Sequence, residues 1–376
     1  MRQSFRTFIA ILLFCALPSL SVAQIFETPI QEIDLLFAGD IMQHEAQLKM
    51  AREENGSYSF SYCFRHIKEL VKSADISIAN LETTIGKGGY SGYPSFCAPD
   101  SFLYAVKEAG FSTLLFANNH CMDKGRRGAL HTLDMLDSLH IAHCGVYRNA
   151  KEREERYPLI IDKKGVRVAI LNYTYSTNGR EIPHPIVVNL IDKEVIARDI
   201  QAAKEKAPDA IIACMHWGDE YVSLPSQQIK ELSNWLIEQG VNHIIGNHPH
   251  VIQPIEIREN DNTPDRNVVA YSTGNLVSNM SLRRTDGGIM LAMTLRKILN
   301  YTRPRNVHYL FTWIAPKTSD GQRDFTIYPA ATTKITDWEY AEEKRQLFIN
   351  DSRSLFKNYN KGDIGEMSID TVYISR

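Results

Sequence analysis

The sequence lacks an excess of either charge: 42 lysines and arginines face 44 aspartates and glutamates, which leaves a formal net charge of −2 over 376 residues. A chain so close to neutral has no overall attraction for nucleic acid or for an acidic membrane surface. It also contains no basic stripe and no RNA- or DNA-binding motif. We therefore expect no nucleic-acid partner.

Cysteine is scarce as well. The chain has six cysteines, with no Cys-x-x-Cys pair and no tight spacing among them. This pattern argues against a disulfide framework and against a zinc ribbon. The sequence likewise has no internal repeat, no low-complexity tract and no Pro/Gly/Ser-rich linker. Its length suits one large α/β domain, or one and a half domains.

The N-terminal segment has the features of a secretory signal. Arg2 and Arg6 supply positive charge, residues 8–17 form a short apolar core, and small residues lead to Ala23. We expect residues 1–23 to be a cleaved signal peptide and the protein to be exported, to the periplasm or to the outer surface. The alternative is an uncleaved anchor that keeps the protein membrane-associated, but the apolar core is short for a membrane span.

From residue 33 to about 280 the chain alternates between short apolar runs and helix-type segments, which predicts an α/β layered domain. The apolar runs are continuous, as expected of strands covered on both faces: LLFA, ISIA, TLLFA, AIIACM and HIIG. Helices are expected over 100–110, 127–140, 192–206 and 225–240, and Asp100 is expected to cap the first.

A second group of strands is less regular. The segment YPLIIDKKGVRVAILNYTY predicts two strands joined by a Lys-Lys-Gly turn. With VVAYSTGNL and GIMLAMTLRK, these strands predict a second set that is partly antiparallel, and two sheets packed face to face with helices outside would accommodate them all. Over 281–376 we expect strands that complete the sandwich, a charged helix near 337–357 and a polar tail.

Five of the apolar runs lead into residues of a type that binds metals. These residues are Asp40, Glu82, Asn119 with His120, His216, and His248 with His250. Because sites in open α/β sheets form beyond the carboxyl ends of the strands, we expect these side chains to converge. Carboxylate, amide and imidazole groups suit a pair of divalent cations. Each residue alone also has an ordinary interpretation as a turn, cap or core residue, so only their joint placement favours a site.

Two of these motifs also make predictions about geometry. Two cations held close together need a shared ligand, and the carboxylates of Asp40 and Glu82 are candidates for it. His248 and His250 are two residues apart in a segment that we expect to be extended, which would point both side chains to the same side. That spacing suits one histidine on each metal, or both on one metal.

As a set, the motifs resemble those of the CapA family of capsule and poly-γ-glutamate biosynthesis proteins, in the same order over roughly residues 33–280. The motifs that carry the resemblance are Gly-Asp40-Ile-Met42, Asn80-Leu-Glu82, Asn118-Asn119-His120, His216-Trp-Gly-Asp-Glu220-Tyr221, Gly246-Asn-His248-Pro-His250 and Ser272-Thr-Gly-Asn275. That family is similar to the calcineurin-like metallophosphatases. The resemblance therefore implies a four-layer αββα sandwich of the metallo-dependent phosphatase type with a dinuclear metal centre.

The resemblance also implies a role for each residue. Asp40 and His250 would bind the first metal, and Glu82 would stand at the position of the bridging carboxylate. The second metal would be bound by Asn119, His216 and His248. His120 would be the general acid or a substrate-orienting histidine. The residues that would orient the ligands or contact substrate are Asn80, Asn118, Glu220, Tyr221 and Asn275.

One position departs from the metallophosphatase pattern. Metallophosphatases carry a metal-binding histidine two residues after the first aspartate, and here that position is Met42, which hard cations do not favour. The first metal site is therefore poorer in ligands, and the nearby His44 is a candidate to compensate. The sequence leaves open whether one or two divalent metals bind, and whether they are manganese, zinc or iron.

Three functions fit these predictions. The leading one is an exported CapA-like metal-dependent hydrolase of phosphoesterase type in capsule or poly-γ-glutamate metabolism. The second is a metal-dependent amide hydrolase or transferase on a polyglutamate-like polymer, and the third is a non-catalytic polymer-binding or export component. The expected partners are an anionic cell-surface polymer or its precursor, and capsule-synthesis membrane proteins. Arg283 and Arg284 could pair with an anionic substrate, although a solvated turn is the favoured interpretation.

Overall fold

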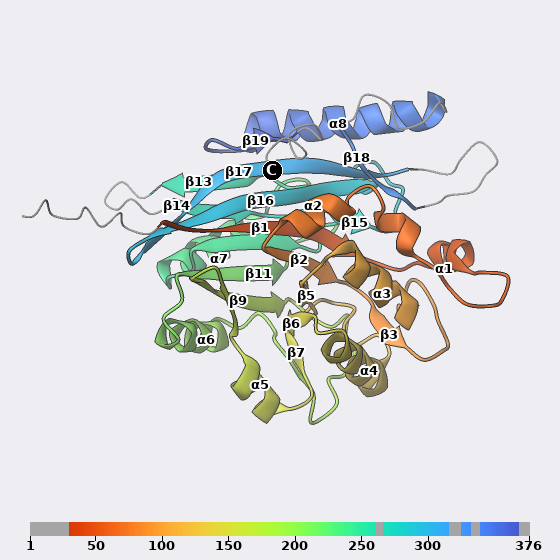
Figure 1. Ribbon diagram of the computed structural model, residues 1–376, viewed down its shortest axis with the longest axis horizontal. Coiled ribbons are helices and arrows are strands. Elements are labelled where there is room, and N and C mark those ends of the chain that lie inside the picture. The colour runs from red at the N-terminus through yellow and green to blue at the C-terminus, as the bar shows by residue number, and fades with distance from the viewer. Residues whose placement is uncertain (1–29, 260–265, 316–324, 332–338, 368–376) are drawn as a thin grey trace, which may run out of the picture.

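A computed structural model describes residues 30–259, 266–315, 325–331 and 339–367. The predicted signal peptide, residues 1–23, and the end of the predicted polar tail lie outside the described residues. Within them, two large sheets face each other and helices lie on the outer sides (Figure 1).

The first sheet has nine strands among the described residues, and its main order is antiparallel from β18 to β1 and parallel from β1 to β6. Its order is β18 (Ile327–Pro329), β17 (Tyr301–Ile314), β16 (Gly287–Ile298), β1 (Ile30–Ile41), β2 (Ile76–Leu81), β5 (Thr113–Leu115) and β6 (Ala142–Cys144), with β15 (Asn275–Val277) on β1 and β19 (Gly365–Glu366) on β17. The parallel part, from β1 to β6, contains the predicted runs LLFA, ISIA and TLLFA.

The second sheet has six strands in the described part of the chain. Its order is β13 (Ile255–Glu259), β14 (Arg266–Ala270), β12 (His243–Asn247), β11 (Ala210–His216), β9 (Val166–Thr174) and β8 (Leu159–Lys163). The hairpin predicted at Lys-Lys-Gly is confirmed as β8 and β9, with left-handed φ angles of 47° at Lys164 and 81° at Gly165. Two short ribbons complete the strands: β3 (Thr84–Gly86) with β4 (Cys97–Pro99), and β7 (Val146–Tyr147) with β10 (Val187–Val188).

One strand prediction was wrong. The segment GIMLAMTLRK was expected beside the hairpin in the second set, but it forms β16 and pairs with β1 in the first sheet. The segment VVAYSTGNL divides between the sheets, because β14 pairs with β12 while β15 pairs with β1. An apolar pattern identifies a strand but not its neighbour, so the error concerns pairing and not strand type.

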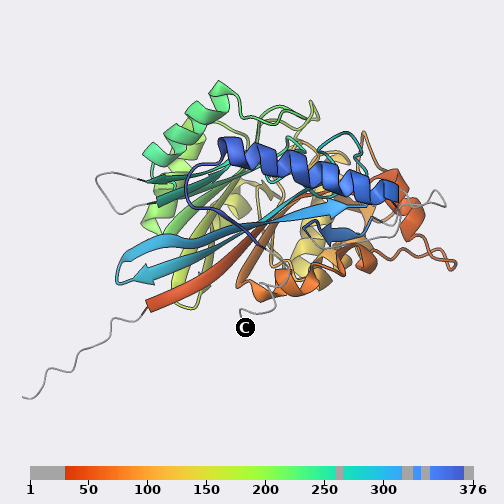
Figure 2. The ribbon, with the colours of Figure 1, turned by 90° about the horizontal axis from the view of Figure 1, so that it is seen from above.

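The helices cover both outer faces of the paired sheets. Near the first sheet they are α1 (Glu45–Ala51), η1 (Ser61–Phe64), α2 (Lys68–Ser73), α3 (Asp100–Ala109) and α4 (Gly125–Ser138), and near the second they are α5 (Ala150–Arg156), α6 (Lys193–Glu205) and α7 (Gln227–Glu238) (Figure 2). The last helix, α8 (Glu339–Tyr359), packs instead on the face of β17 that belongs to the core between the sheets, through Phe348 and Phe356. None of these helices in the described residues is long and apolar enough to cross a membrane. Two facing sheets with helices on their outer faces confirm the predicted αββα sandwich.

The α3 helix shows a smaller correction. It ends at Gly110, whose φ is 110°, as the sequence predicts, but its N-cap residue is Pro99 and Asp100 is its first helical residue. The Asp100 carboxylate instead lies 2.7 Å from Nε2 of His131 on α4.

The strand β1 shows why its sequence is continuously apolar. Leu35 and Phe37 belong to the core between the two sheets, whereas Leu36 and Ala38 belong to the core under α1–α4. Side chains alternate between the two faces of a strand, so a strand with a core on each side needs apolar residues at successive positions. The same burial on both faces holds the carboxyl end of β1 in place, where Asp40 lies.

Gly39 gives the first testable prediction. A Cβ at this position would lie 2.0 Å from the carbonyl oxygen of Gly274, and the same oxygen accepts a hydrogen bond from Asp40 N at 2.9 Å. We expect Gly39→Ala to lower the free energy of unfolding by about 3 kcal/mol, measured by urea denaturation, because the backbone must shift. The control is Gly56→Ala, which meets open space and should cost roughly 1 kcal/mol from its left-handed φ alone. Equal losses in the two variants would contradict this packing argument.

Candidate metal centre

The structure brings the predicted ligand residues together where the carboxyl ends of strands from both sheets meet. Asp40 and Glu82 lie at the ends of β1 and β2 in the first sheet, and His216 ends β11 in the second. Six side chains meet there, each at most 3% exposed: Asp40, Glu82, Asn119, His216, His248 and His250. The site is therefore buried, and it depends on the face-to-face packing of the two sheets.

The donor atoms form two groups that share Glu82. One group is Asp40, Glu82 and His250, the other is Glu82, His216 and His248, and the donor atoms within each group lie within 4.8 Å of one another. Glu82 Oε1 is 3.7 Å from His216 Nε2 and 3.8 Å from His250 Nε2. One carboxylate oxygen thus faces an imidazole of each group, as a ligand between two cations must.

The electrostatics of these groups fit a divalent metal. Burial and the neighbouring Asp40 carboxylate raise the pKa of Glu82 well above its ordinary value. Burial, with the other imidazoles, lowers the pKa of His216 well below its ordinary value and that of His248 to about 3. Glu82 Oε1 and His248 Nδ1 are buried with no hydrogen-bond partner among the described residues. Burying crowded carboxylates and neutral imidazoles whose atoms have no hydrogen-bond partner costs free energy. A bound cation offsets this cost because it coordinates those atoms.

Asn119 has a geometry that suits the second group. Its Oδ1 lies 2.8 Å from His216 Nε2. That distance is a hydrogen bond in the structure as it stands. It also fits two donor atoms of one cation, because ligands bound at about 2.1 Å lie roughly 3 Å apart around the metal.

Asn80 connects the two carboxylates of the site. Its Nδ2 donates to Asp40 Oδ1 at 2.8 Å and to Glu82 Oε2 at 3.2 Å. Its Oδ1 accepts from Asn118 Nδ2 at 3.2 Å, and Asn118 Oδ1 accepts from the backbone N of His120 at 3.1 Å. These amides fix the carboxylates and the loop after β5 relative to each other, which is the orienting position that the family resemblance implies.

Three other predicted residues surround the site. Asn275 Oδ1 accepts from His250 Nδ1 at 3.0 Å, which leaves His250 Nε2 toward the shared carboxylate. Tyr221 lies at the open side, 46% exposed, with its ring centroid 6.2 Å from that of His250. Glu220 is exposed and forms a third donor group with His248 and His250. Burial and the Glu220 carboxylate raise the pKa of Tyr221 to about 12.

His120 lies beside the donor groups and belongs to none of them in the described residues. Its Nδ1 is 2.8 Å from Asp123 Oδ2, and its ring packs edge-on against Phe96 with centroids 4.6 Å apart. Asp123 Oδ2 also accepts from the backbone N of Phe96 at 2.6 Å. An ionised carboxylate only accepts, so Nδ1 carries the proton and Nε2 is the atom left to exchange one.

The sequence interpretation missed Asp123 and Tyr175. The acidic residue three positions after His120 was a usable signal, because a turn brings positions i and i+3 together. Tyr175 packs on His248 with ring centroids 4.5 Å apart and forms a wall of the site. No spacing rule pointed to Tyr175, which lies just beyond the end of β9.

The expected backbone of the His-Pro-His segment was wrong. His248 and His250 have left-handed φ angles of 99° and 57°, so the segment is a tight turn and not an extended strand. The turn returns the chain over the strand ends immediately after β12, and both rings reach the site with centroids 5.9 Å apart. Non-glycine residues adopt such angles at a cost, which is common at functional sites.

At the position where metallophosphatases carry a metal-binding histidine, Met42 packs in the core. Met42 is 1% exposed, and its backbone N donates to Val277 O at 2.9 Å. His44 is the N-cap residue of α1, and its Nδ1 accepts from Asn279 N at 3.2 Å. The donor groups found among the described residues do not include His44, so nothing supports its compensating role.

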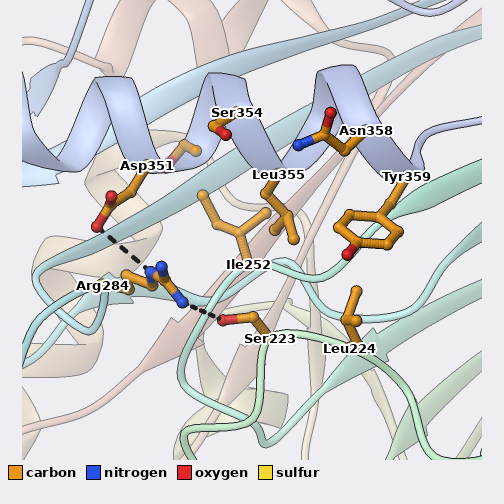
Figure 3. A pocket seen from close by; sticks show the side chains of 10 residues that line it. Ser223, Leu224, Ile252, Arg284, Asp351, Ser354, Leu355, Asn358 and Tyr359 are labelled. Atoms are coloured by element: carbon orange, nitrogen blue, oxygen red, sulfur yellow. Dashed lines mark hydrogen bonds and ion pairs between the residues drawn. The ribbon is translucent and has the colours of Figure 1, made fainter.

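Arg283 and Arg284 are held by α8. Nε of Arg283 lies 2.6 Å from Asp351 Oδ2, and Nε of Arg284 lies 3.3 Å from the same oxygen. Arg284 also donates to Ser223 Oγ at 3.1 Å, at the edge of a small pocket between α8 and the segment after Tyr221 (Figure 3). These two arginines therefore lie in a surface turn, the interpretation that the sequence favoured, but their charges are paired with Asp351 and are not simply solvated.

Two facing β-sheets flanked by helices form an α/β sandwich, and the buried carboxylate–imidazole cluster at their strand ends is a candidate dinuclear metal centre. The chain belongs to the family described as bacterial capsule synthesis protein PGA_cap, whose family model matches residues 34–280. This membership confirms the resemblance that the motifs predict.

Two relatives are similar over most of the chain. Capsule biosynthesis protein CapA of Bacillus anthracis is 25% identical over 348 residues, which cover 88% of this chain and 81% of that protein. PGA biosynthesis protein CapA of Bacillus subtilis (strain 168) is 26% identical over 275 residues, which cover 69% of this chain and 67% of that protein.

Solved structures with some similarity include NAD nucleotidase (NadN) of Haemophilus influenzae, with a TM-score of 0.47 and 13% identity over 89% of this chain. The matched region spans 57% of the NadN chain. Calcineurin-like phosphoesterase YfkN of Bacillus subtilis has a TM-score of 0.43 and 15% identity, covering 87% of this chain and 99% of that chain.

Proposed function

We propose that the protein is an exported, metal-dependent hydrolase of phosphoesterase type that acts on an anionic cell-surface polymer or its precursor. The observation that carries the proposal is the buried Glu82 carboxylate shared by two groups of donor atoms. The family and the names of its two CapA relatives support a role in the cell envelope. The signal-like segment over residues 1–23 supports export.

The residues of the site divide between two cations. Asp40 and His250 would hold the first together with Glu82, and His216 and His248 would hold the second with Glu82, joined by the Asn119 amide oxygen. Manganese, zinc and iron all suit such a mixture of carboxylate, amide and imidazole ligands. A divalent cation supplies Lewis-acid stabilisation at the oxygen of the scissile bond and makes water more acidic.

The remaining chemistry comes from side chains that do not bind metal. In its doubly protonated form, with Nδ1 donating to Asp123, His120 gives the proton on Nε2 to the leaving oxygen and returns to the Nδ1–H form, while Asp123 holds the orientation of the ring. Tyr175 packs on His248, and Tyr221 lies near His250, so the two aromatic rings flank the ligand cluster on its exposed side. They limit the access of bulk water to the reacting atoms.

A second candidate is hydrolysis or transfer of an amide bond on a polyglutamate-like polymer. The name of the Bacillus subtilis relative, a PGA biosynthesis protein, favours this bond. The catalytic demand is similar, since negative charge develops on a carbonyl oxygen instead of a phosphoryl oxygen. A third candidate, polymer binding without catalysis alongside capsule-synthesis membrane proteins, is favoured by Met42 at a position where metallophosphatases have a ligand.

The test compares both bonds on one preparation. The protein is stripped of metal, reloaded with manganese, and assayed with bis(p-nitrophenyl) phosphate and with γ-glutamyl-p-nitroanilide. We expect manganese-dependent hydrolysis of the phosphodiester that disappears in His216→Ala. Hydrolysis of only the anilide would replace the leading proposal by the second. Bound metal without either activity would favour the third, and equal rates with and without metal would contradict the metal-dependent mechanism.

A further inference from the structure

A basic cavity lies between the loop after β3 and the start of α4. Its volume is about 700 Å³, and three cationic side chains line it: Lys87, Lys124 and Arg127. We call it the basic cavity. It is separate from the donor groups of the metal centre, none of whose residues line it.

The cations of the basic cavity are not neutralised by the protein. Lys87, Lys124 and Arg127 make no side-chain hydrogen bond or ion pair with another residue in the described part of the chain. The acidic side chain on its wall, Asp134, lies 2.7 Å from Arg148 and is already paired. Three uncompensated positive charges around one cavity attract an anion, and their side chains lose little by turning toward it.

The backbone around the cavity adds to the positive potential. Gly88 and Gly89 have φ angles of 149° and 63°, and a Cβ at either position would meet nothing within 4 Å, so the loop is bare and accessible. The α4 helix begins at Gly125 with no acidic residue in its first turn and no side-chain cap from Lys124. The positive end of a helix dipole beside a cationic cluster suits an oxyanion, which accepts several hydrogen bonds at once.

Two residues on the wall of the basic cavity are sequence neighbours of residues that contact His120. Lys124 directly follows Asp123, which holds His120. Cys97 on the cavity wall directly follows Phe96, which packs against the His120 ring. Each connection is one step along the backbone and one side-chain contact, so the basic cavity lies within the length of a few polymer units from His120.

We propose that the basic cavity is a subsite for an oxyanion, a carboxylate or a phosphate, carried by the substrate chain one or more units from the scissile bond. The assignment to the substrate chain rests on the proposed function, whereas binding of an oxyanion in the cavity does not. Arg127 is the principal contact, because its guanidinium can bind both oxygens of a carboxylate or phosphate at once.

The experiment measures anion binding without metal, so that it is independent of hydrolysis. Pentaglutamate and tripolyphosphate are titrated calorimetrically into the protein at low salt in EDTA. The variants are Arg127→Gln and Lys124→Gln, and the matched control is Arg126→Gln, an exposed arginine next in sequence that does not line the cavity. We expect at least one probe to bind, with about tenfold weaker affinity in each cavity variant, the size of one lost charge-assisted contact, and unchanged affinity in the control.

The two probes separate the sources of the oxyanion: preference for pentaglutamate assigns a carboxylate chain, and preference for tripolyphosphate assigns a phosphate chain. Failure of both probes to bind at low salt would overturn the subsite. A loss in Arg126→Gln equal to that in Arg127→Gln would also overturn it, because it would mean general surface attraction. Probe binding that depends on Arg127 in a protein without hydrolytic activity would keep the subsite and reject only the proposed function.

Discussion

Replacing Glu82 by glutamine is expected to abolish binding of both divalent cations, with affinity reduced by more than about 100-fold, since even residues that only orient a ligand are worth 10–100-fold. The substitution keeps the size of the side chain and removes the charge that both donor groups share. Oε1 of Glu82 faces His216 and His250 at 3.7 and 3.8 Å, so this buried carboxylate lies beside an imidazole of each group. The measurement is elemental analysis after equilibration with manganese, together with calorimetric titration.

Two further variants make the prediction specific. Asp40→Asn should weaken only the cation held with His250, and His216→Ala should weaken only the cation held with His248. Glu155→Gln, an exposed glutamate on α5, is the matched control and should bind manganese as the wild type does. Retention of one ion at wild-type affinity in Glu82→Gln would show that the carboxylate belongs to a single site and would refute the bridging role.

The second large effect is expected from His120→Ala, which should lower the turnover of a phosphodiester by about 10²–10⁴-fold, the usual contribution of a general acid. Metal content should stay unchanged, because His120 is in neither of the two donor groups. The separation of activity from metal content is the distinctive part of this prediction. A parallel loss of metal would instead make His120 a ligand.

Asp123→Asn extends the same test to the partner of His120. The new amide can donate to Nδ1 and carries no charge, so it no longer holds the proton on Nδ1 and no longer stabilises the doubly protonated ring that acts as the acid. We expect an intermediate loss of turnover with metal content retained. Asp162→Asn, an exposed carboxylate on β8, is the matched control and should leave turnover unchanged. Wild-type turnover in Asp123→Asn would show that the ring needs no such partner.

The positions of the ligand residues could be predicted because each follows an apolar run, and a continuously apolar strand is one that is buried on both faces. Strands such as β1 are apolar on both faces, so the first polar residue at their ends marks the edge of the sheets. Asp40, Glu82 and His216 are such residues, and parallel strands bring their ends to one edge. This argument needs no knowledge of which strands are neighbours.

Strand pairing and local backbone geometry could not be predicted in the same way. β16 joins β1 through contacts between residues more than 250 positions apart, and no local pattern encodes that partner. His248 and His250 adopt left-handed φ angles because the packing of two sheets forces a tight turn after β12, which overrides the preference of an extended segment. Asp123 was missed because its role depends on a side-chain contact with His120 inside the loop between β5 and α4.

The most direct test of the account is a crystal grown with manganese and measured by anomalous scattering. The account predicts two peaks, one among Asp40, Glu82 and His250 and one among Glu82, His216 and His248, with the Glu82 carboxylate between them. Lower occupancy at the first position would agree with the methionine at residue 42. A crystal with manganese bound elsewhere and no peak beside Glu82 would contradict it.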